Sequence, residues 1–197
     1  MNQLIIIAHP KKDSFSQIIK NELEKHFIER DDQVKIRDLY ELKIDPVLTE
    51  GELKFNKEGN ICPDILVEQN YISWSDQLTI IYPLWWNAFP AILKGYIDRV
   101  FINGFAFKIN GHGPEGLLKG KKVRLITTAG MTEESLKKSN IYEGLKITQD
   151  HGVFEFCGME VLEHLYVTEI TSLSEEEKQK EMDKIISRIF VKNRVRT

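Results

Sequence analysis

The chain has 197 residues, a formal net charge of -3 at pH 7 and 42% hydrophobic residues, which suits one domain, residues 1–197, with its own core. The charge balance argues against a nucleic-acid partner, because domains that bind nucleic acid normally carry a basic excess. Cys62 and Cys157 lack the spacing of a zinc site, and no metal is predicted. No apolar run has the length of a signal peptide or a membrane span, so we expect a cytoplasmic protein.

The first third of the chain alternates short apolar runs with an amphipathic one. Residues 4–8 are a continuous, mostly β-branched run, which predicts a parallel strand covered on both faces. Apolar side chains then recur every four positions from Phe15 to Phe27, with Ile18 beside them, and predict one face of a helix. Residues 34–37 predict a second strand. The polar segment 41–62 predicts a long surface excursion with one helical turn after Thr49.

The middle of the chain predicts a helix from Pro63 to about Trp74 and a third strand over residues 78–82. Pro83 ends this strand, and Pro90 begins the next helix. The apolar stripe of that helix is wider than a surface helix needs, so we expect part of it to face a partner subunit.

The last third predicts a fourth strand over residues 123–127, a helix within about 142–156 and a fifth strand over 161–167. Ser174 and Glu177 form a capping-box pair that predicts the start of a final helix. The short basic run at 192–196 is typical of a solvated helix end. Five strands alternating with helices predict a doubly wound α/β domain with a parallel sheet. Ligands of such sheets bind at the carboxyl ends of the strands, so the loops after the first, third and fourth strands are the candidate site.

The first of these loops, residues 9–16, joins a strand to a helix N-terminus, where free backbone N–H groups and the helix dipole favour an anion. Ser14 and Ser16 add hydroxyl donors, and His9, Lys11 and Lys12 add positive character, which suits a phosphate monoester. The alternative interpretation makes Ser14 an N-cap and His9 a turn residue. The loop matches neither the dinucleotide-binding GxGxxG pattern nor the Walker pattern.

The second loop, residues 83–90, places two adjacent tryptophans just past a strand end. Because adjacent side chains diverge, we expect at most one of them in the core and the other against a flat ligand or a partner chain. Hydrophobic packing with dimerisation is the competing interpretation. The third loop, residues 127–132, has small residues and a glycine that let a ligand approach the backbone, whose N–H groups would bond a ring edge.

Several longer stretches carry a resemblance that covers nearly the whole chain. They are Leu4–Pro10 with Ser14–Ser16, Asp38–Tyr40, Pro83–Trp86, Pro90–Gly95, Asp98–Phe101, Phe105–Phe107, Thr127–Gly130 and Phe156–Met159. In these stretches the sequence resembles the flavodoxin-like NAD(P)H:quinone oxidoreductase family, and the part from Pro83 to Phe101 is the most specific.

The resemblance implies a homodimer of flavodoxin-like α/β domains with a flavin at the subunit boundary. Each domain would hold a five-stranded parallel sheet in the order 2-1-3-4-5, with helices on both faces. The flavin phosphate and ribityl chain would be held by His9, Ser14, Phe15 and Ser16. The ring would be lined by Pro83, Leu84, Trp85, Trp86 and Asn87. Its other edge would be bonded by Thr127, Thr128, Ala129 and Gly130.

FMN is the expected flavin, because the larger family members that bind FAD carry a C-terminal extension and this chain stops after one helix. FAD is the alternative, since an adenosine half can lie on the surface. Family members often place a Tyr and a His after a Thr-Thr-Gly-Gly loop. Here Ala129 precedes Gly130, and residues 131–135 contain neither a Tyr nor a His. Tyr142 is the stand-in and the expected catalytic residue.

The activity implied is hydride transfer from NAD(P)H through the bound flavin to a quinone-like acceptor, in a ping-pong cycle. One alternative is a flavodoxin-type electron carrier, although such carriers have a phosphate loop rich in Thr, Ser and Gly. Another is an ancillary subunit of a potassium-efflux system, which would bind a membrane-protein partner from the membrane surface. A flavin-free structural dimer is the third.

Overall fold

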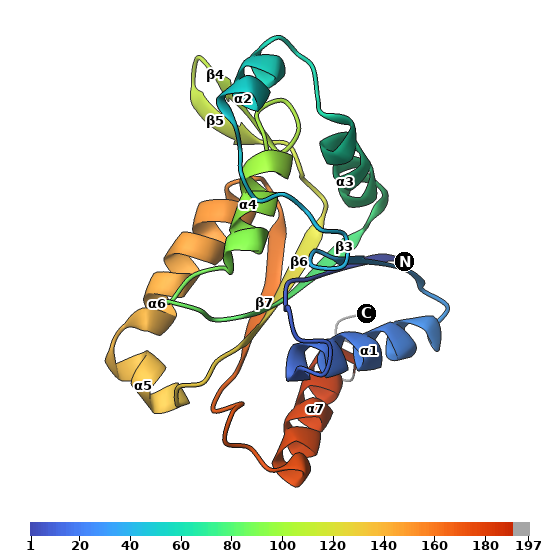
Figure 1. Cartoon of the computed structure of the whole chain (residues 1–197), viewed down its shortest axis with the longest axis vertical. Helices are drawn as coiled ribbons and strands as arrows, with labels where there is room; N and C mark the ends of the chain where they lie inside the picture. The colour runs from blue at the N-terminus through green and yellow to red at the C-terminus, as the bar shows by residue number, and fades with distance from the viewer. Residues whose placement is uncertain (191–197) are drawn as a thin grey trace.

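The computed structural model describes residues 1–190, so the basic run at 192–196 lies outside the described residues. A parallel five-stranded sheet runs through the molecule in the order β2-β1-β3-β6-β7 (Figure 1). Its strands are β1 (Asn2–Ile7), β2 (Gln33–Asp38), β3 (Gln77–Pro83), β6 (Lys122–Thr128) and β7 (Glu160–Val167). Counted along the chain, this order is 2-1-3-4-5, so the predicted doubly wound fold is confirmed.

Helices cover both faces of the sheet. Along β1, Leu4 and Ile6 pack toward α3 (Pro63–Trp74) and α4 (Ala91–Val100), whereas Ile5 and Ile7 pack toward α1 (Phe15–Ile28) and α7 (Glu175–Phe190). This alternation is the two-residue period of a strand, and it explains why the run carries no polar residue. None of the helices in residues 1–190 is long and apolar enough to cross a membrane.

The ends of the two helices on the α1 face follow the predicted signals. Ser14 is the N-cap of α1, and the capping box of α7 is confirmed, because Glu177 Oε2 accepts the Ser174 N–H at 2.8 Å. The prediction for Ile18 was wrong. Its side chain is 42% exposed, whereas Ile19 is fully buried, because neighbouring residues on a helix point about 100° apart.

The predicted single turn after Thr49 was an underestimate. The structure forms a two-turn helix, α2 (Glu50–Lys57), whose first turn is capped by the Thr49 hydroxyl. A buried ion pair between Glu52 and Arg99 ties α2 to α4 at 2.9 Å. The segment 41–62 also lies directly against the α4 backbone. A Cβ added to Gly95 of α4 would come within 2.2 Å of the Pro46 carbonyl oxygen. These tertiary contacts leave no trace in local periodicity.

Two further elements differ from expectation. A hairpin of β4 (Phe107–Asn110) and β5 (Gly113–Gly116) was not predicted, because its strands are short and mostly polar. The helix expected within 142–156 is two elements, α6 (Ile141–Leu145) and a π-helical segment, η1 (Lys146–Glu155), preceded by α5 (Glu133–Lys138). The wide apolar stripe of α4 is mostly buried within the chain itself.

Candidate functional site

Three loops from distant parts of the sequence meet at the carboxyl edge of the sheet. The Ser16 and Thr128 hydroxyl oxygens are 3.2 Å apart, and the Leu84 N–H donates to the Thr128 carbonyl oxygen at 2.7 Å. The His9 and Trp85 rings lie 6.1 Å apart between centroids. We call the set formed by residues 9–16, 83–90 and 127–130 the three-loop site. It stands where ligands of doubly wound sheets bind.

The first loop carries an anion site built mainly from backbone. The Ser14 hydroxyl accepts the Gln17 N–H at 3.3 Å, so Ser14 is an N-cap and its own hydroxyl hydrogen is left to donate. The Phe15 side chain is buried in the core below, and Ser16 is turned toward Thr128. Phe15 can therefore serve a ligand only through its backbone, at the N-terminus of α1, where N–H groups and the helix dipole favour an anion.

His9 borders this anion site as a neutral donor. Burial lowers the pKa of His9 from its usual value, so the ring is uncharged at pH 7. Its Nδ1 accepts the Lys11 N–H at 3.1 Å, which places the ring proton on Nε2. His9 therefore offers a ligand a hydrogen bond rather than a charge.

A cavity of about 520 Å³ opens beside the first loop. It is lined by His9, Pro10, Lys12, Gln17, Asp38, Tyr40, Glu41 and Lys43. The Asp38 carboxylate accepts Gln17 Nε2 at 2.7 Å and the Tyr40 N–H at 3.1 Å, which fixes the wall between β2 and α1. The lining holds two lysines and two carboxylates, and Lys12 pairs with Glu41 at 3.1 Å, so the cavity has no excess of positive charge.

The second loop forms a strained turn with an exposed tip. The Ala88 N–H donates to the Trp85 carbonyl oxygen at 3.1 Å, and the two central residues, Trp86 and Asn87, have φ of 52° and 54°. Tight turns of this kind normally use Asn-Gly. A left-handed conformation costs a bulky residue roughly 1–2 kcal/mol. The Trp86 side chain is 99% exposed, so no packing of this side chain against the described residues offsets that cost.

The third loop presents an open face. A Cβ on Gly130 would meet no atom nearer than the Thr171 hydroxyl at 3.9 Å, and Gly130 does not need the left-handed region. Neither packing nor backbone geometry requires a glycine here, whereas a ligand against the turn would. The Ala129 N–H is taken by the Val167 carbonyl oxygen at 2.8 Å, so this N–H is not free to bond a ring edge as expected.

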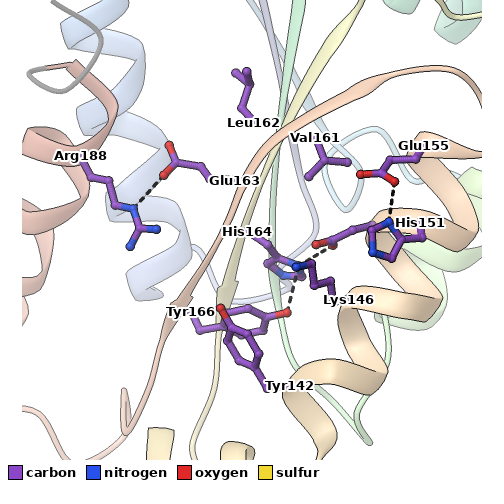
Figure 2. Close-up of a pocket in the computed structure, with 11 residues that line it drawn as sticks. Tyr142, Lys146, His151, Glu155, Val161, Leu162, Glu163, His164, Tyr166 and Arg188 are labelled. Atoms are coloured by element: carbon purple, nitrogen blue, oxygen red, sulfur yellow. Dashed lines mark hydrogen bonds and ion pairs between the residues drawn. The ribbon is translucent and has the colours of Figure 1, made fainter. Parts of the chain in front are cut away.

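The structure places Tyr142 away from the three loops. Its ring packs 4.8 Å from the Tyr166 ring, which stacks 4.1 Å from the His164 ring on β7 (Figure 2). Tyr142 is linked to the three-loop site only through this stack, because His164 Nε2 lies 2.8 Å from the Thr127 hydroxyl. The expected catalytic role of Tyr142 stays a prediction.

Sequence reasoning missed His164 and its partner Asp150. His164 Nδ1 lies 2.7 Å from Asp150 Oδ1, and both side chains are nearly buried. The only signal was a histidine inside the strand predicted over 161–167. Asp150 gave no signal, because its direction depends on the π-helical geometry of η1.

Comparison with known proteins gives the family. A family model for the flavodoxin-like fold matches residues 1–189. An uncharacterized NAD(P)H oxidoreductase of Haemophilus influenzae is 41% identical over 164 residues, which cover 83% of this chain and 81% of that protein. The human ribosyldihydronicotinamide dehydrogenase (quinone) is 32% identical over 179 residues, which cover 81% and 78%. The crystal structure of a candidate quinone reductase from Klebsiella pneumoniae shares 28% identity with a TM-score of 0.88, covering 96% of this chain and 83% of the other.

The chain therefore belongs to the flavodoxin-like family. Within this family its relatives place it among the oxidoreductases of the NAD(P)H dehydrogenase (quinone) type, and it is an enzyme.

Proposed function

We propose that the chain binds FMN at the three-loop site and passes hydride from NAD(P)H to a quinone or a similar small acceptor. The observation that carries this proposal is the meeting of three loops around Thr128, each with a feature that suits a bound flavin. These features are a capped helix N-terminus beside a cavity, an exposed tryptophan in a strained turn, and a glycine with open space above it.

The residues fit a flavin mononucleotide. The N-terminus of α1, the Ser14 hydroxyl and His9 Nε2 would hold the phosphate. Trp85 and Trp86 would supply an apolar wall for the ring, and the Gly130 turn would let the ring edge approach the backbone. The choice of FMN rather than FAD is part of this proposal.

When bound, the flavin supplies a two-electron centre that accepts and returns a hydride. The protein residues bind, orient and exclude water. Trp85 and Trp86 would cover part of the bound ring, and the Ser16–Thr128 contact holds the first loop against the third. NAD(P)H and the acceptor would use the same open face in turn, which gives a ping-pong cycle. The fully exposed Trp86 supports a homodimer, in which a second chain would cover that side chain.

The proposal is tested by steady-state NAD(P)H oxidation with a benzoquinone, using protein loaded with FMN. We expect parallel lines in double-reciprocal plots and FMN in the heat-released supernatant. Flavin binding without turnover would identify an electron carrier. Protein that binds neither FMN nor FAD would contradict the proposal.

Two replacements of His9 test whether its side chain contributes a hydrogen bond to FMN binding. We expect His9→Gln to bind FMN within about threefold of the native affinity and His9→Ala to lose about tenfold, since one bond to a charged group is lost. The measurement is quenching of FMN fluorescence at pH 7.5, where the lowered pKa keeps His9 neutral. Equal losses in both variants would show that His9 does not act as a donor.

Trp86→Gly tests the strained turn. The free energy of unfolding should stay within about 1 kcal/mol of the native value, because the side chain is exposed and glycine suits the positive φ. FMN affinity should fall about tenfold, or the native dimer should dissociate, since one aromatic contact is worth about that much. Urea titration, fluorescence quenching and sedimentation give the three readouts. Unchanged affinity with unchanged mass would contradict the assignment of this loop.

A further inference from the structure

A polar groove runs along the outer edge of β7, separate from the three loops (Figure 2). Two cavities of about 420 and 280 Å³ make up this groove, and they share Tyr142, His164, Tyr166 and Arg188 among their lining residues. Most charged side chains here are paired at the surface, such as His151 with Glu155 and Arg188 with Glu163. His164 and Asp150 differ from these, because their side chains are only 5% and 6% exposed.

His164 forms a buried relay between Asp150 and Thr127. Its Nδ1 lies 2.7 Å from Asp150 Oδ1, and its Nε2 lies 2.8 Å from the Thr127 hydroxyl oxygen. The Tyr82 hydroxyl lies 3.3 Å from the same Nε2 and donates to Gln149 Oε1. An imidazole with both nitrogens engaged has a fixed orientation, and its hydrogen bonds transmit its position to its partners.

The proton positions in this relay follow from the acceptors. An ionised Asp150 can only accept, so Nδ1 carries a hydrogen and, in the neutral ring, Nε2 accepts the Thr127 hydroxyl hydrogen. The Thr127 hydroxyl is thereby held toward His164, directly behind the third loop.

The neighbours leave His164 as the group that balances this carboxylate. Burial raises the pKa of Tyr82 and of Tyr166, so both stay neutral, and Tyr142 packs beyond Tyr166. Lys146 and Arg188 line the outer groove, and Arg188 is paired with Glu163. A buried carboxylate is costly unless it is paired or hydrogen-bonded, and removing its partner destabilises the fold. An unpaired carboxylate also repels a second negative charge nearby.

The π-helical geometry of η1 is a second observation in favour of a role beyond packing. Asp150 lies in this ten-residue segment, whose backbone is wider than an α-helix. Such segments are rare and are frequently found at functional sites. Here the segment turns a charged side chain inward, where it is 6% exposed, instead of toward water.

We propose that His164 is a positioning residue for the three-loop site. Anchored by Asp150, it holds the Thr127 hydroxyl behind the Thr127–Gly130 turn and separates that turn from the Asp150 carboxylate, so that negative charge on a ligand at the turn is tolerated. This inference rests on the proposed function, because it assumes that FMN binds at the three loops.

The test compares two isosteric variants, each loaded with FMN, by the ratio of the dissociation constants for oxidised and reduced FMN. This ratio follows from the midpoint potential of bound and free flavin. His164→Gln removes the ring that donates to Asp150 and orients Thr127, and we expect reduced FMN to lose roughly tenfold relative to oxidised FMN. Asp150→Asn removes the carboxylate, so the ratio should stay at the native value or move in the opposite direction. A purely structural role would shift both variants the same way.

The matched control is His151→Gln, an exposed histidine in the same groove, which should keep the native ratio. If His164→Gln does not fold, nitrogen NMR of the native holoprotein replaces it. We expect the His164 ring nitrogens to shift on flavin reduction while those of His151 do not, and unmoved His164 signals would overturn the inference. Native protein that binds no FMN would instead refute the proposed function. FMN binding with equal ratios in the His164 and His151 variants would refute only the relay.

Discussion

Gly130→Val is expected to weaken FMN binding by at least about a hundredfold while the fold stays intact. The free space above Gly130 has no neighbour nearer than 3.9 Å, so a valine fits within the free chain. The same side chain would occupy the space through which the flavin ring reaches the turn, and a closely packed site has no room for added methyl groups (about 2.7 kcal/mol for a hundredfold loss). Fluorescence titration with FMN measures the loss.

The matched control is Gly51→Val on α2. Gly51 has a comparable environment, since its added Cβ would meet only the Thr49 hydroxyl at 3.8 Å, and it is not part of the three loops. This variant should bind FMN as the native protein does. Native affinity in Gly130→Val would mean that the ring does not lie against this turn.

Arg99→Met is expected to lower the free energy of unfolding by about 3–5 kcal/mol, because it leaves a buried carboxylate without its partner. Arg99 Nε donates to both Glu52 oxygens, at 3.1 and 2.9 Å, and both side chains are less than 10% exposed. The same guanidinium donates to the Asp45 carbonyl oxygen at 2.9 Å. Urea denaturation followed by tryptophan fluorescence measures the change.

The double variant Arg99→Met with Glu52→Leu isolates the cause. Removing both charges should restore most of the lost stability, since a hydrophobic pair of similar volume often replaces a buried ion pair without cost. If Arg99→Met alone lowered the free energy of unfolding by less than about 1 kcal/mol, the Glu52–Arg99 pair would contribute no more than an ordinary surface ion pair.

The parts of the fold that the sequence predicted are those set by local patterns. The buried run at residues 4–8, the four-residue repeat from Phe15 and the capping box at Ser174 each depend on a few neighbouring residues. The β4–β5 hairpin and α2 depend on contacts with distant segments, such as Glu52 with Arg99. Local signals therefore indicated only the first turn of α2, after Thr49, and not the hairpin.

The candidate site shows the same division. The three loops follow from the rule that ligands bind at the carboxyl ends of parallel strands, and Ser16, Leu84 and Thr128 do meet there. The Trp86 turn depends on a left-handed backbone conformation, and the inward direction of Asp150 depends on the π-helical geometry of η1. Residue types alone rarely indicate either conformation. Tyr142 was chosen by its position in the chain; its ring packs against Tyr166 beside β7, and its catalytic role stays a prediction.

A crystal structure of the protein with FMN tests the central claim most directly. The phosphate should lie at the N-terminus of α1 beside Ser14 and His9, with the ring between Trp85 and the Gly130 turn. A ring bound in the groove outside β7, or at any other surface than the three loops, would contradict it.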